Sequence, residues 1–329
     1  MSKKGRILSG MRPTGRLHIG HLSVLENWVG LQDSYRCFFF VADLHALTTA
    51  FDQTGNIRES IRQMLADWLA VGIDPEKSVI FLQSKIPHHA ELHLLFSMIT
   101  PLGWLERVPT YKDTVLQHRE RGRDITTYGF LGYPLLQAAD ILAYRADAVP
   151  VGEDQLPHLE LCREVARRFN HLYGTVFPEP RALLSRVPML PGMDGRKMSK
   201  SYANVIELAA TQKELQGAVN SMITDPARIR KTDPGHPEVC TVHKYHGIYR
   251  ADKLSGLEEE CRAGQIGCVA CKKTLGGTLE ELLAPIRARR ESIISDKSYI
   301  DDVLAEGTRR AAEEARLTME RVWPKVFKG

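Results

Sequence analysis

The sequence predicts an α/β protein in which a doubly wound parallel sheet is followed by an all-α region. Two observations carry this prediction. Short continuous apolar runs, suited to strands buried on both faces, alternate with amphipathic helical stretches as far as about residue 183. Beyond that point the apolar spacing is helical almost throughout. Because strands that alternate with helices usually pair in parallel, one open sheet with helices on its faces is expected.

Each predicted element rests on its own apolar spacing. The segment 38–42 reads FFFVA and leaves no polar side for solvent, whereas 57–71 places its apolar residues on one helical stripe. The predicted strands are 5–10, 38–42, 78–83 and 146–151. The predicted helices are 22–31, 57–71, 91–98, a helix that opens at Tyr133-Pro134, 156–169, 212–222, 254–261, 275–295 and 299–322.

The composition is that of a globular protein with room for a sizeable core. The chain has 329 residues, of which 43% are hydrophobic and 26% charged, with a net charge of +4. This mild charge permits contact with nucleic acid without requiring it. No apolar run is long enough for a membrane span, and no hydrophobic segment follows the first four residues, so a cytoplasmic protein without a signal peptide is expected.

Three parts are expected along the chain. Residues 1–185 form the α/β domain, and 186–205 form a linker and loop rich in proline and glycine. Residues 206–329 form the helical domain, whose last helix is a candidate to pack back on the first domain.

The pentapeptide Leu17-His18-Ile19-Gly20-His21 lies between the first strand and the helix 22–31. A helix N-terminus favours anions, because its backbone N–H groups are free and its dipole end is positive. His18 and His21 can donate hydrogen bonds to phosphate oxygens, and Gly20 leaves room for a close approach to the backbone. Two histidines at a helix start can equally be capping or packing residues.

The loop Gly195-Arg196-Lys197-Met198-Ser199-Lys200-Ser201 carries three cations and two hydroxyls behind a glycine. It can be a solvated basic loop. Lysines on a mobile loop are also suited to neutralising a polyphosphate as charge moves onto the leaving group.

Taken together, Leu17–His21 and Lys197–Ser201 resemble the HIGH and KMSKS signatures of class I aminoacyl-tRNA synthetases. A third stretch, Val149 to Gln155 followed by His158 to Leu161 and Arg167 to Asn170, resembles the bacterial tryptophanyl-tRNA synthetases. The resemblance runs over nearly the whole chain. It implies a Rossmann-like catalytic domain at 1–185, a KMSKS loop within 186–205 and an anticodon-binding domain at 206–329.

The resemblance also implies an ATP site. The catalytic residues are expected to be His18, Gly20, His21, Lys197 and Lys200. Further contacts with ATP are expected from Arg12, Pro13, Thr14, Gly152, Glu153, Asp154, Met189, Met198, Ser199 and Ser201. For Asp154, an ordinary N-cap of the helix 156–169 is the structural alternative. Mg²⁺ is expected to arrive with ATP rather than in a protein cage.

Asp140 is the candidate for recognition of the amino acid. A carboxylate beside so much apolar surface needs a donor, and Arg145 is a structural candidate for that partner. The resemblance instead implies that Asp140 accepts the indole N–H of tryptophan, with Tyr133, Gln137, Gln155 and His45 completing the pocket. The sequence departs from the commoner family pattern at Gln137 and at Leu8, which leaves the detailed packing of this pocket open.

Four of the six cysteines gather late in the chain, whereas Cys37 and Cys162 are expected in the core. Cys240, Cys261, Cys268 and Cys271 are spaced C-x20-C-x6-C-x2-C, with only one tight pair. Zinc usually uses two tight pairs, and uneven spacing suits a cubane cluster. The spacing resembles that of the synthetase subgroup with a [4Fe–4S] cluster, except for a shorter first gap. Zn²⁺, with a histidine replacing one thiol, and free thiols are the alternatives.

The resemblance implies two reaction steps: formation of tryptophanyl-adenylate and pyrophosphate from L-tryptophan and ATP, then transfer to tRNA(Trp). A homodimer is implied as well. A tyrosyl-tRNA synthetase is one alternative, and a non-catalytic RNA-binding paralogue is another. Several arginines on the late helices form either a solvated face or contacts with tRNA phosphates; they are Arg287, Arg289, Arg290, Arg309 and Arg310.

Overall fold

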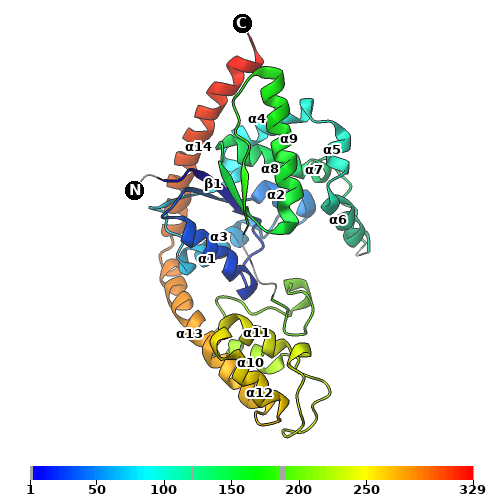
Figure 1. Cartoon of the computed structure of the whole chain (residues 1–329). Helices are drawn as coiled ribbons and strands as arrows, with labels where there is room; N and C mark the ends of the chain where they lie inside the picture. Colours follow the sequence, from blue (N-terminus) through cyan, green and yellow to red (C-terminus); the bar gives the residue numbers. More distant parts are fainter. Residues whose placement is uncertain (1–2, 121, 185–189, 329) are drawn as a thin grey trace.

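A computed structural model describes residues 3–120, 122–184 and 190–328. Its centre is a five-stranded parallel sheet in the order β3-β2-β1-β4-β5 (Figure 1). The strands are β1 Arg6–Met11, β2 Arg36–Val41, β3 Ser78–Leu82, β4 Ala148–Val151 and β5 Arg181–Leu184. The doubly wound parallel sheet predicted from the sequence is confirmed. The edge strand β5 was not predicted, because its RALL sequence is half-exposed and carries little apolar signal.

Side chains alternate between the two faces of the sheet and build two cores. Cys37 and Phe39 of β2 belong to the core shared with α1 and α3, whereas Phe38 and Phe40 belong to the core shared with α4, α8 and α9. The helices are α1 Leu22–Leu31, α3 Ile57–Val71, α4 His88–Ile99, α8 Tyr133–Ala143 and α9 Leu156–Tyr173. Cys162 is fully buried in the second core, so both cysteines predicted for the core lie there.

Two helices with a clear apolar stripe have the predicted ends, whereas α9 and the helices predicted at 275–295 and 299–322 are longer than predicted. The ends of α1 and α3 match residue for residue, and Gly72, at φ +124°, ends α3 in a conformation that few other residues adopt. Short helices without such a stripe were missed: α2 Asp43–Ala50, α5 Leu102–Glu106, α6 Pro109–Glu120, α7 Tyr128–Leu131 and α11 Thr241–Tyr249. Single turns of 3-10 helix are η1 Ile19–His21, η2 Gln83–Lys85, η3 Glu153–Gln155, η4 Lys200–Tyr202, η5 Pro237–Val239 and η6 Ala251–Lys253.

The C-terminal region is helical, as predicted. It contains α10 Gln212–Ser221, α11, α12 Leu254–Arg262, α13 Cys268–Ser295 and α14 Tyr299–Val326. The 28-residue α13 starts among α10–α12 and reaches α3. The chain then continues along the sheet region as α14 (Figure 1). Helix α14 covers the edge strand β3, and a Cβ on Gly307 would overlap the backbone of Ile80. The last helix thus packs against the sheet region.

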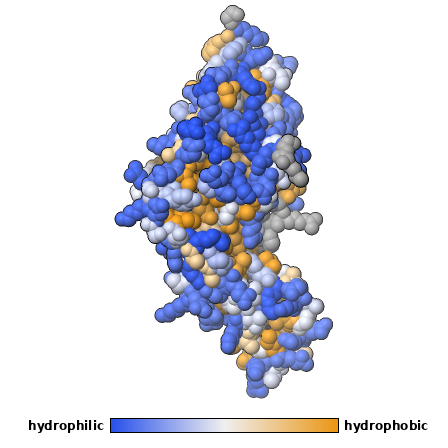
Figure 2. Space-filling view, turned by 90° about the vertical axis from the view of Figure 1, so that its left-hand side faces the viewer, coloured by the Kyte–Doolittle hydropathy of each residue, from blue (hydrophilic) through white to orange (hydrophobic). Residues whose placement is uncertain are grey.

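No helix in the described ranges is long and apolar enough to cross a membrane. The face in Figure 2 is mainly hydrophilic, with hydrophobic side chains gathered near its middle.

Candidate active site

A cleft of about 400 Å³ opens at the carboxyl ends of β1 and β4. The strand order reverses between these two strands, since β2 and β3 lie on one side and β5 on the other. Open parallel sheets bind ligands at such a reversal. The residues predicted for tryptophan all line this cleft: His45, Tyr133, Gln137, Asp140 and Gln155.

The cleft walls are largely apolar. Trp28, Phe40 and Ile141 line it, together with Leu8 and Gln137, the two positions that depart from the family pattern. Gly10 of β1 is also at the wall, and a Cβ there would overlap the Phe40 ring. A flat aromatic ligand therefore fits the character of the walls.

Asp140 is fully buried and accepts three side-chain hydrogen bonds. Its Oδ2 is 2.7 Å from His45 Nε2, and its Oδ1 accepts from Gln83 Nε2 at 2.7 Å and from His89 Nδ1 at 2.6 Å. The Gln83 amide oxygen accepts the backbone N–H of Leu44 at 3.2 Å, which turns the amide NH₂ toward Asp140. The carboxylate is therefore held in a fixed orientation before any ligand enters.

These contacts decide the charge of Asp140. Burial opposes its ionisation, but the hydrogen bonds from His45 and His89 outweigh burial and lower the pKa of the carboxyl to about 2. His89 Nε2 is in turn 2.8 Å from the hydroxyl oxygen of Tyr144. The suggestion that Arg145 is the structural partner is wrong, since Arg145 lines a different cavity and the donors come from His45, Gln83 and His89.

A second polar chain crosses the cleft wall from α8 to α9. The Tyr133 hydroxyl lies 2.8 Å from His158 Nε2, and His158 Nδ1 lies 3.1 Å from Gln155 Oε1. Gln155 Nε2 donates to Asp154 Oδ2 at 2.8 Å. Asp154 makes no N-cap bond to α9, whose N-cap residue is Gln155, so the interpretation of Asp154 as an N-cap is wrong. Its carboxylate instead orients the Gln155 amide.

The Leu17–His21 segment forms the turn η1 directly before α1. Nδ1 of His18 accepts the Gly20 N–H at 3.2 Å, and Nδ1 of His21 accepts the His18 N–H at 3.3 Å. A ring nitrogen that accepts carries no proton, so the neutral His18 ring carries its proton on Nε2. Nδ1 of His21 also lies 3.3 Å from the His18 carbonyl oxygen, so either tautomer of His21 finds a backbone partner there. The space beside Gly20 is narrow, because a Cβ there would lie 3.0 Å from the His18 ring and 3.3 Å from Met198 Sδ.

Both histidines are neutral at physiological pH. Burial, followed by the charges of His21 and Lys200, lowers the pKa of His18 to about 3. Burial also lowers the pKa of His21 to about 4, against a hydrogen bond with His18 that opposes the shift. The two rings, with centroids 3.9 Å apart, are therefore uncharged hydrogen-bond donors rather than cations.

The loop before η4 is held by the buried side chain of Asn204. Its Oδ1 accepts the Ser199 N–H at 2.8 Å, and its Nδ2 donates to Asp194 Oδ1 at 2.7 Å and to the carbonyl oxygen of Lys197 at 3.1 Å. Met198 is buried in the core beside Gly20. One amide side chain thus holds the backbone of Lys197 and Ser199 and the side chain of Asp194.

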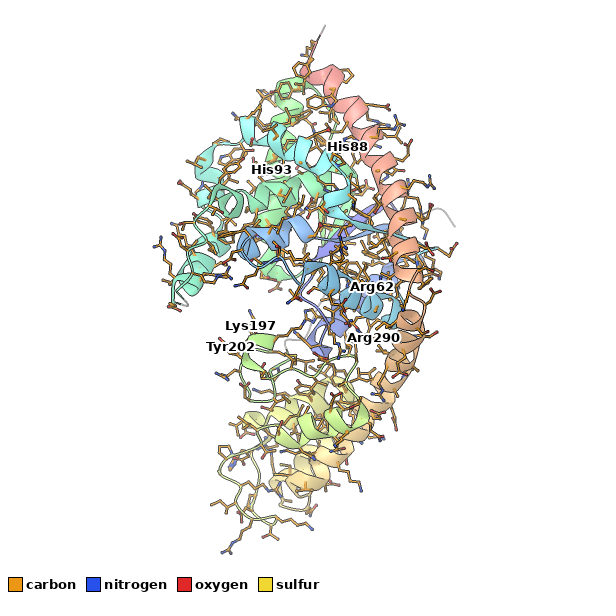
Figure 3. The ribbon with its side chains drawn as sticks, turned by 180° about the vertical axis from the view of Figure 1, so that it is seen from behind. Arg62, His88, His93, Lys197, Tyr202 and Arg290 are labelled. Carbon is orange, nitrogen blue, oxygen red and sulfur yellow. The ribbon has the colours of Figure 1, made fainter. Side chains whose placement is uncertain are left out.

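The loop meets the β1 side of the site through Lys200. Its Nζ donates to the carbonyl oxygen of Thr14 at 2.6 Å, and burial lowers the pKa of its ammonium group. Lys197 is exposed at the end of the helical region that faces the sheet region (Figure 3). Ser201 belongs to η4, and Met189 lies outside the described residues.

Only part of the predicted ATP set lines the cleft itself. Arg12 and Gly152 do so, and the Arg12 guanidinium also donates to the Thr49 hydroxyl. Pro13, Thr14, Glu153 and Asp154 adjoin them in the chain, while the loop 197–201 reaches this region through the Lys200–Thr14 bond.

The four late cysteines lie near one another at the N-terminal end of α13. Arg228 Nη1 is 3.7 Å from Cys261 Sγ and 4.0 Å from Cys268 Sγ, and Cys271 Sγ is 3.5 Å from His246 Nε2. Burial and then the neighbouring thiols, Cys240 among them, raise the pKa of Cys271 to about 12.

The four thiols have the donor chemistry of a metal-cluster site. No three His, Cys, Asp or Glu side chains in the described ranges stand close enough together to hold an ion. However, the buried Arg228 Nε has no hydrogen-bond partner among the residues described. Four sulfur donors beside a cation with an unpaired donor fit an anionic inorganic group.

Sequence reasoning gave no role in the site to four residues that organise it: Gln83, His89, Asn204 and His158, the last of which it named only within the stretch that carries the family resemblance. Gln83 directly follows β3, and the carboxyl ends of parallel strands are where open α/β sheets bind ligands, so its position was a signal that could have found it. His89 shares a helical face with Leu92 and Phe96, where a buried histidine is the only signal. Nothing in the local pattern around Asn204 marks it as buried.

Known proteins match this chain along nearly all of its length. The family model described as "tRNA synthetases class I (W and Y)" matches residues 1–284, so the chain belongs to the class I tRNA synthetases for tryptophan and tyrosine. A tryptophan--tRNA ligase of Thermotoga maritima is 56% identical over 321 residues, which cover 96% of this chain and 97% of the relative. One from Aquifex aeolicus is 46% identical and covers 96% and 98%.

A solved structure agrees with these sequences. Tryptophanyl-tRNA synthetase from Campylobacter jejuni, complexed with ADP and tryptophan, matches with a TM-score of 0.86 and 32% identity, over 98% of this chain and 99% of the other. Within its class, the chain belongs to the tryptophan--tRNA ligases, which are aminoacyl-tRNA synthetases. The enzyme class predicted from the sequence is confirmed.

Proposed function

We propose that the cleft binds L-tryptophan beside ATP with Mg²⁺, joins them into tryptophanyl-adenylate and pyrophosphate, and passes the tryptophanyl group to tRNA(Trp). The observation that carries the proposal is the buried, ionised Asp140 in an apolar cleft. Among the residues described, one hydrogen bond reaches its Oδ2, from His45, and a carboxylate oxygen can accept two. The indole N–H is the donor that this second position would accept.

The attacking group in the first step belongs to the substrate, because the tryptophan carboxylate attacks the α-phosphate. The chain therefore positions and stabilises charge rather than supplying a nucleophile. With both neutral rings protonated on Nε2, the tautomer that we assign to them in this step, His18 and His21 donate to phosphate oxygens, and Lys200 and Lys197 neutralise the pyrophosphate. To reach the pyrophosphate, Lys200 must give up its hydrogen bond to the Thr14 carbonyl oxygen. A movement of the loop that carries Lys200 would allow this.

Tryptophan-dependent exchange of pyrophosphate into ATP tests this function. Exchange with tryptophan and little with tyrosine is expected, because the phenolic O–H of tyrosine and the indole N–H of tryptophan lie at different positions relative to the amino-acid Cα, and the fixed Asp140 carboxylate suits one of them. Preference for tyrosine would indicate a tyrosyl enzyme, and no exchange with either would indicate an RNA-binding paralogue. Because the second substrate is tRNA, we place the chain in the cytoplasm.

We further propose that Cys240, Cys261, Cys268 and Cys271 hold a [4Fe–4S] cluster beside Arg228. Protein purified without oxygen is expected to contain about four irons and four sulfides per chain. Cys268→Ser is expected to lose the iron, whereas Cys162→Ala in the core keeps it. Zinc alone would favour the alternative in which His246 replaces one thiol, since it already lies beside Cys271.

We propose a homodimer through the exposed face of α4. Leu94 and Met98 lie one turn apart there, with Met98 72% exposed. A neighbouring cavity is lined by Phe51 and by His93 of the same helix. Such a contiguous apolar surface is typical of an interface. Light scattering is expected to give twice the chain mass for the wild type and a single chain mass for Met98→Asp.

A further inference from the structure

Helix α13 connects the cysteine-bearing region to the sheet region through arginines. Arg287 Nη1 donates to the carbonyl oxygen of Ala210 and Arg289 Nε to that of Ala70, both at 2.6 Å. Arg290 is itself buried and reaches α3. These side chains are therefore occupied within the chain rather than forming a free basic face.

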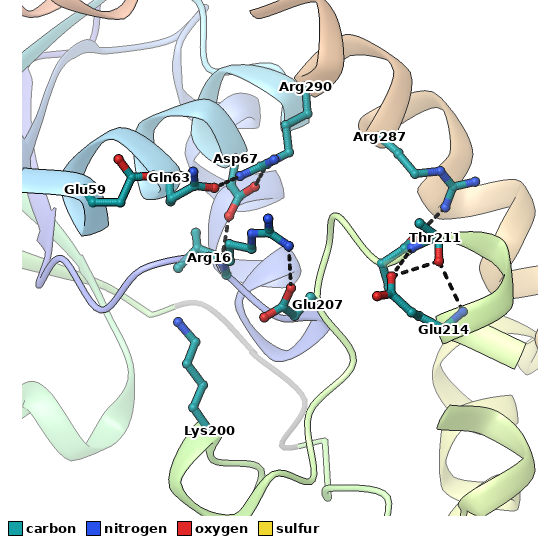
Figure 4. Close-up of polar contacts among 12 residues, drawn as sticks. Arg16, Glu59, Gln63, Asp67, Lys200, Glu207, Thr211, Glu214, Arg287 and Arg290 are labelled. Carbon is teal, nitrogen blue, oxygen red and sulfur yellow. Dashed lines mark hydrogen bonds and ion pairs between the residues drawn. The ribbon is translucent and has the colours of Figure 1, made fainter. Parts of the chain in front are cut away.

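Arg290 meets a carboxylate that also holds the backbone before η1 (Figure 4). Asp67 of α3 is fully buried; its Oδ1 accepts from Arg290 Nε at 2.5 Å, and its Oδ2 accepts the Leu17 N–H at 2.6 Å. Arg290 Nη2 donates to Gln63 Oε1. One carboxylate thus links α13 to the residue directly before His18.

The Leu17–His21 segment has a second anchor from the helical region. The Leu17 carbonyl oxygen accepts the Leu208 N–H at 2.9 Å, and the Ile19 N–H donates to the Ile206 carbonyl oxygen at 2.8 Å. Only Asp67, however, connects this segment to α13 through side chains among the bonds described. The backbone N–H of Leu17 is therefore held by Asp67 of α3, and its carbonyl oxygen by Leu208 in the segment before α10.

We infer that Asp67 and Arg290 are positioning residues for the step in which ATP activates the amino acid. They act by holding the Leu17 N–H, which sets the position of His18, Gly20 and His21. This inference rests on the proposed ATP site. A buried ion pair adds little net stability compared with a well-packed apolar pair, so packing alone gives little reason for one here. The Asp67 oxygen that does not contact Arg290 accepts the Leu17 N–H, and so fixes the backbone just before η1 begins.

Two double variants separate positioning from folding. Asp67→Asn/Arg290→Met leaves an amide oxygen for the Leu17 N–H and an NH₂ that can donate to Gln63, whereas Asp67→Leu/Arg290→Met removes the acceptor. Both avoid an unpaired buried charge. Arg289→Met is the matched control, because it removes an arginine contact between the same two helices that does not reach Leu17.

The readouts are thermal unfolding, amide hydrogen exchange of residues 17–21, and pyrophosphate exchange at varied ATP and tryptophan. In the Leu/Met variant we expect faster amide exchange at 17–21 and a loss in kcat/KM for ATP of about tenfold or more, because small misplacements of phosphate-binding groups are costly. KM for tryptophan is expected to stay within about twofold, since the Asp140 network is untouched. The Asn/Met variant and Arg289→Met are expected to resemble the wild type.

Unchanged amide exchange in a folded Leu/Met variant would overturn the inference. Equal losses in the Asn/Met and Leu/Met variants would also overturn it, because the acceptor for Leu17 would then be irrelevant. Faster amide exchange with unaltered kcat/KM for ATP would instead overturn the proposed role of residues 17–21 in ATP binding. A rise in KM for tryptophan equal to that for ATP would show a general structural role.

Discussion

The two ends of the proposed site are built on different principles. At the tryptophan end, Asp140 is buried among side chains of α2, α4 and α8 and has three donors before any ligand arrives. At the phosphate end, the turn η1 and the loop of Lys200 come from opposite parts of the chain, and Lys200 is bonded to a backbone oxygen. One end is a rigid acceptor, and the other is assembled from two loops.

This difference matches what each substrate demands. Rejecting a similar amino acid requires a buried polar group that remains unpaired with the wrong ligand, and such a group must be held rigidly. Stabilising charge on a departing pyrophosphate requires cations that follow it, and these belong on segments able to move. The variants below test whether the two ends are separate in this way.

The largest effect is expected at the loop. Lys200→Ala is predicted to lower the rate of pyrophosphate exchange about 100-fold or more, because it removes a positive charge that acts mainly in the transition state. Tryptophan affinity, measured by equilibrium binding, is expected to change little. Lys213→Ala, an exposed lysine at the start of α10, serves as the control. A Lys200→Ala variant with the wild-type rate would remove the loop from the mechanism.

A smaller effect, and at the opposite end, is expected for Asp140. Asp140→Ala is predicted to reduce the preference for tryptophan over phenylalanine by about tenfold to 100-fold, because the unpaired acceptor that penalises phenylalanine is gone. KM for ATP is expected to remain that of the wild type. The measurement is the ratio of the two kcat/KM values in pyrophosphate exchange. Selectivity equal to that of the wild type would mean that another group recognises the indole.

The smallest effect is in the pH dependence of stability. The pKa values of His18 and His21, about 3 and about 4, lie below the ordinary 6.5 of the unfolded chain. The unfolded state therefore binds more protons between these limits, and the free energy of unfolding rises with pH there. The contribution of the two rings is fully present above pH 6.5 and is lost as the pH falls toward 4.

Asp140 titrates in a lower window, because its pKa of about 2 lies below the ordinary 3.8. Its contribution is present above pH 3.8 and is lost as the pH falls toward 2. The free energy of unfolding, measured with urea between pH 7 and 5, is therefore expected to fall less steeply in His21→Gln than in the wild type as the pH is lowered. In Asp140→Asn it is expected to fall as steeply as in the wild type. The reverse pattern would show that the ionisation of the two ends is not separate.

Local pattern was enough for long amphipathic elements and for motifs contiguous in sequence. The stripe of α3 gave both of its ends, because its buried face repeats every turn. The pentapeptide 17–21 and the loop 197–201 were recognisable because all residues of each motif lie within a few positions of one another in the sequence. Short helices such as α2 and α7, and the strand β5, were missed because tertiary contacts rather than periodicity stabilise them.

By itself the sequence determined the class of fold and the family, because these follow from periodicity and from short contiguous motifs, and the family resemblance then pointed to several of the residues that line the cleft. The tertiary structure decided which partners those residues have. His89 rather than Arg145 contacts Asp140, and the Asp154 carboxylate accepts from Gln155 rather than from the backbone of α9. Asp67 pairs with Arg290, 223 positions away, and also accepts the Leu17 N–H. The pairings of His89 and Asp67 depend on how helices pack on a sheet, and no spacing along the chain encodes them, whereas the bond between the neighbours Asp154 and Gln155 depends on the local turn η3.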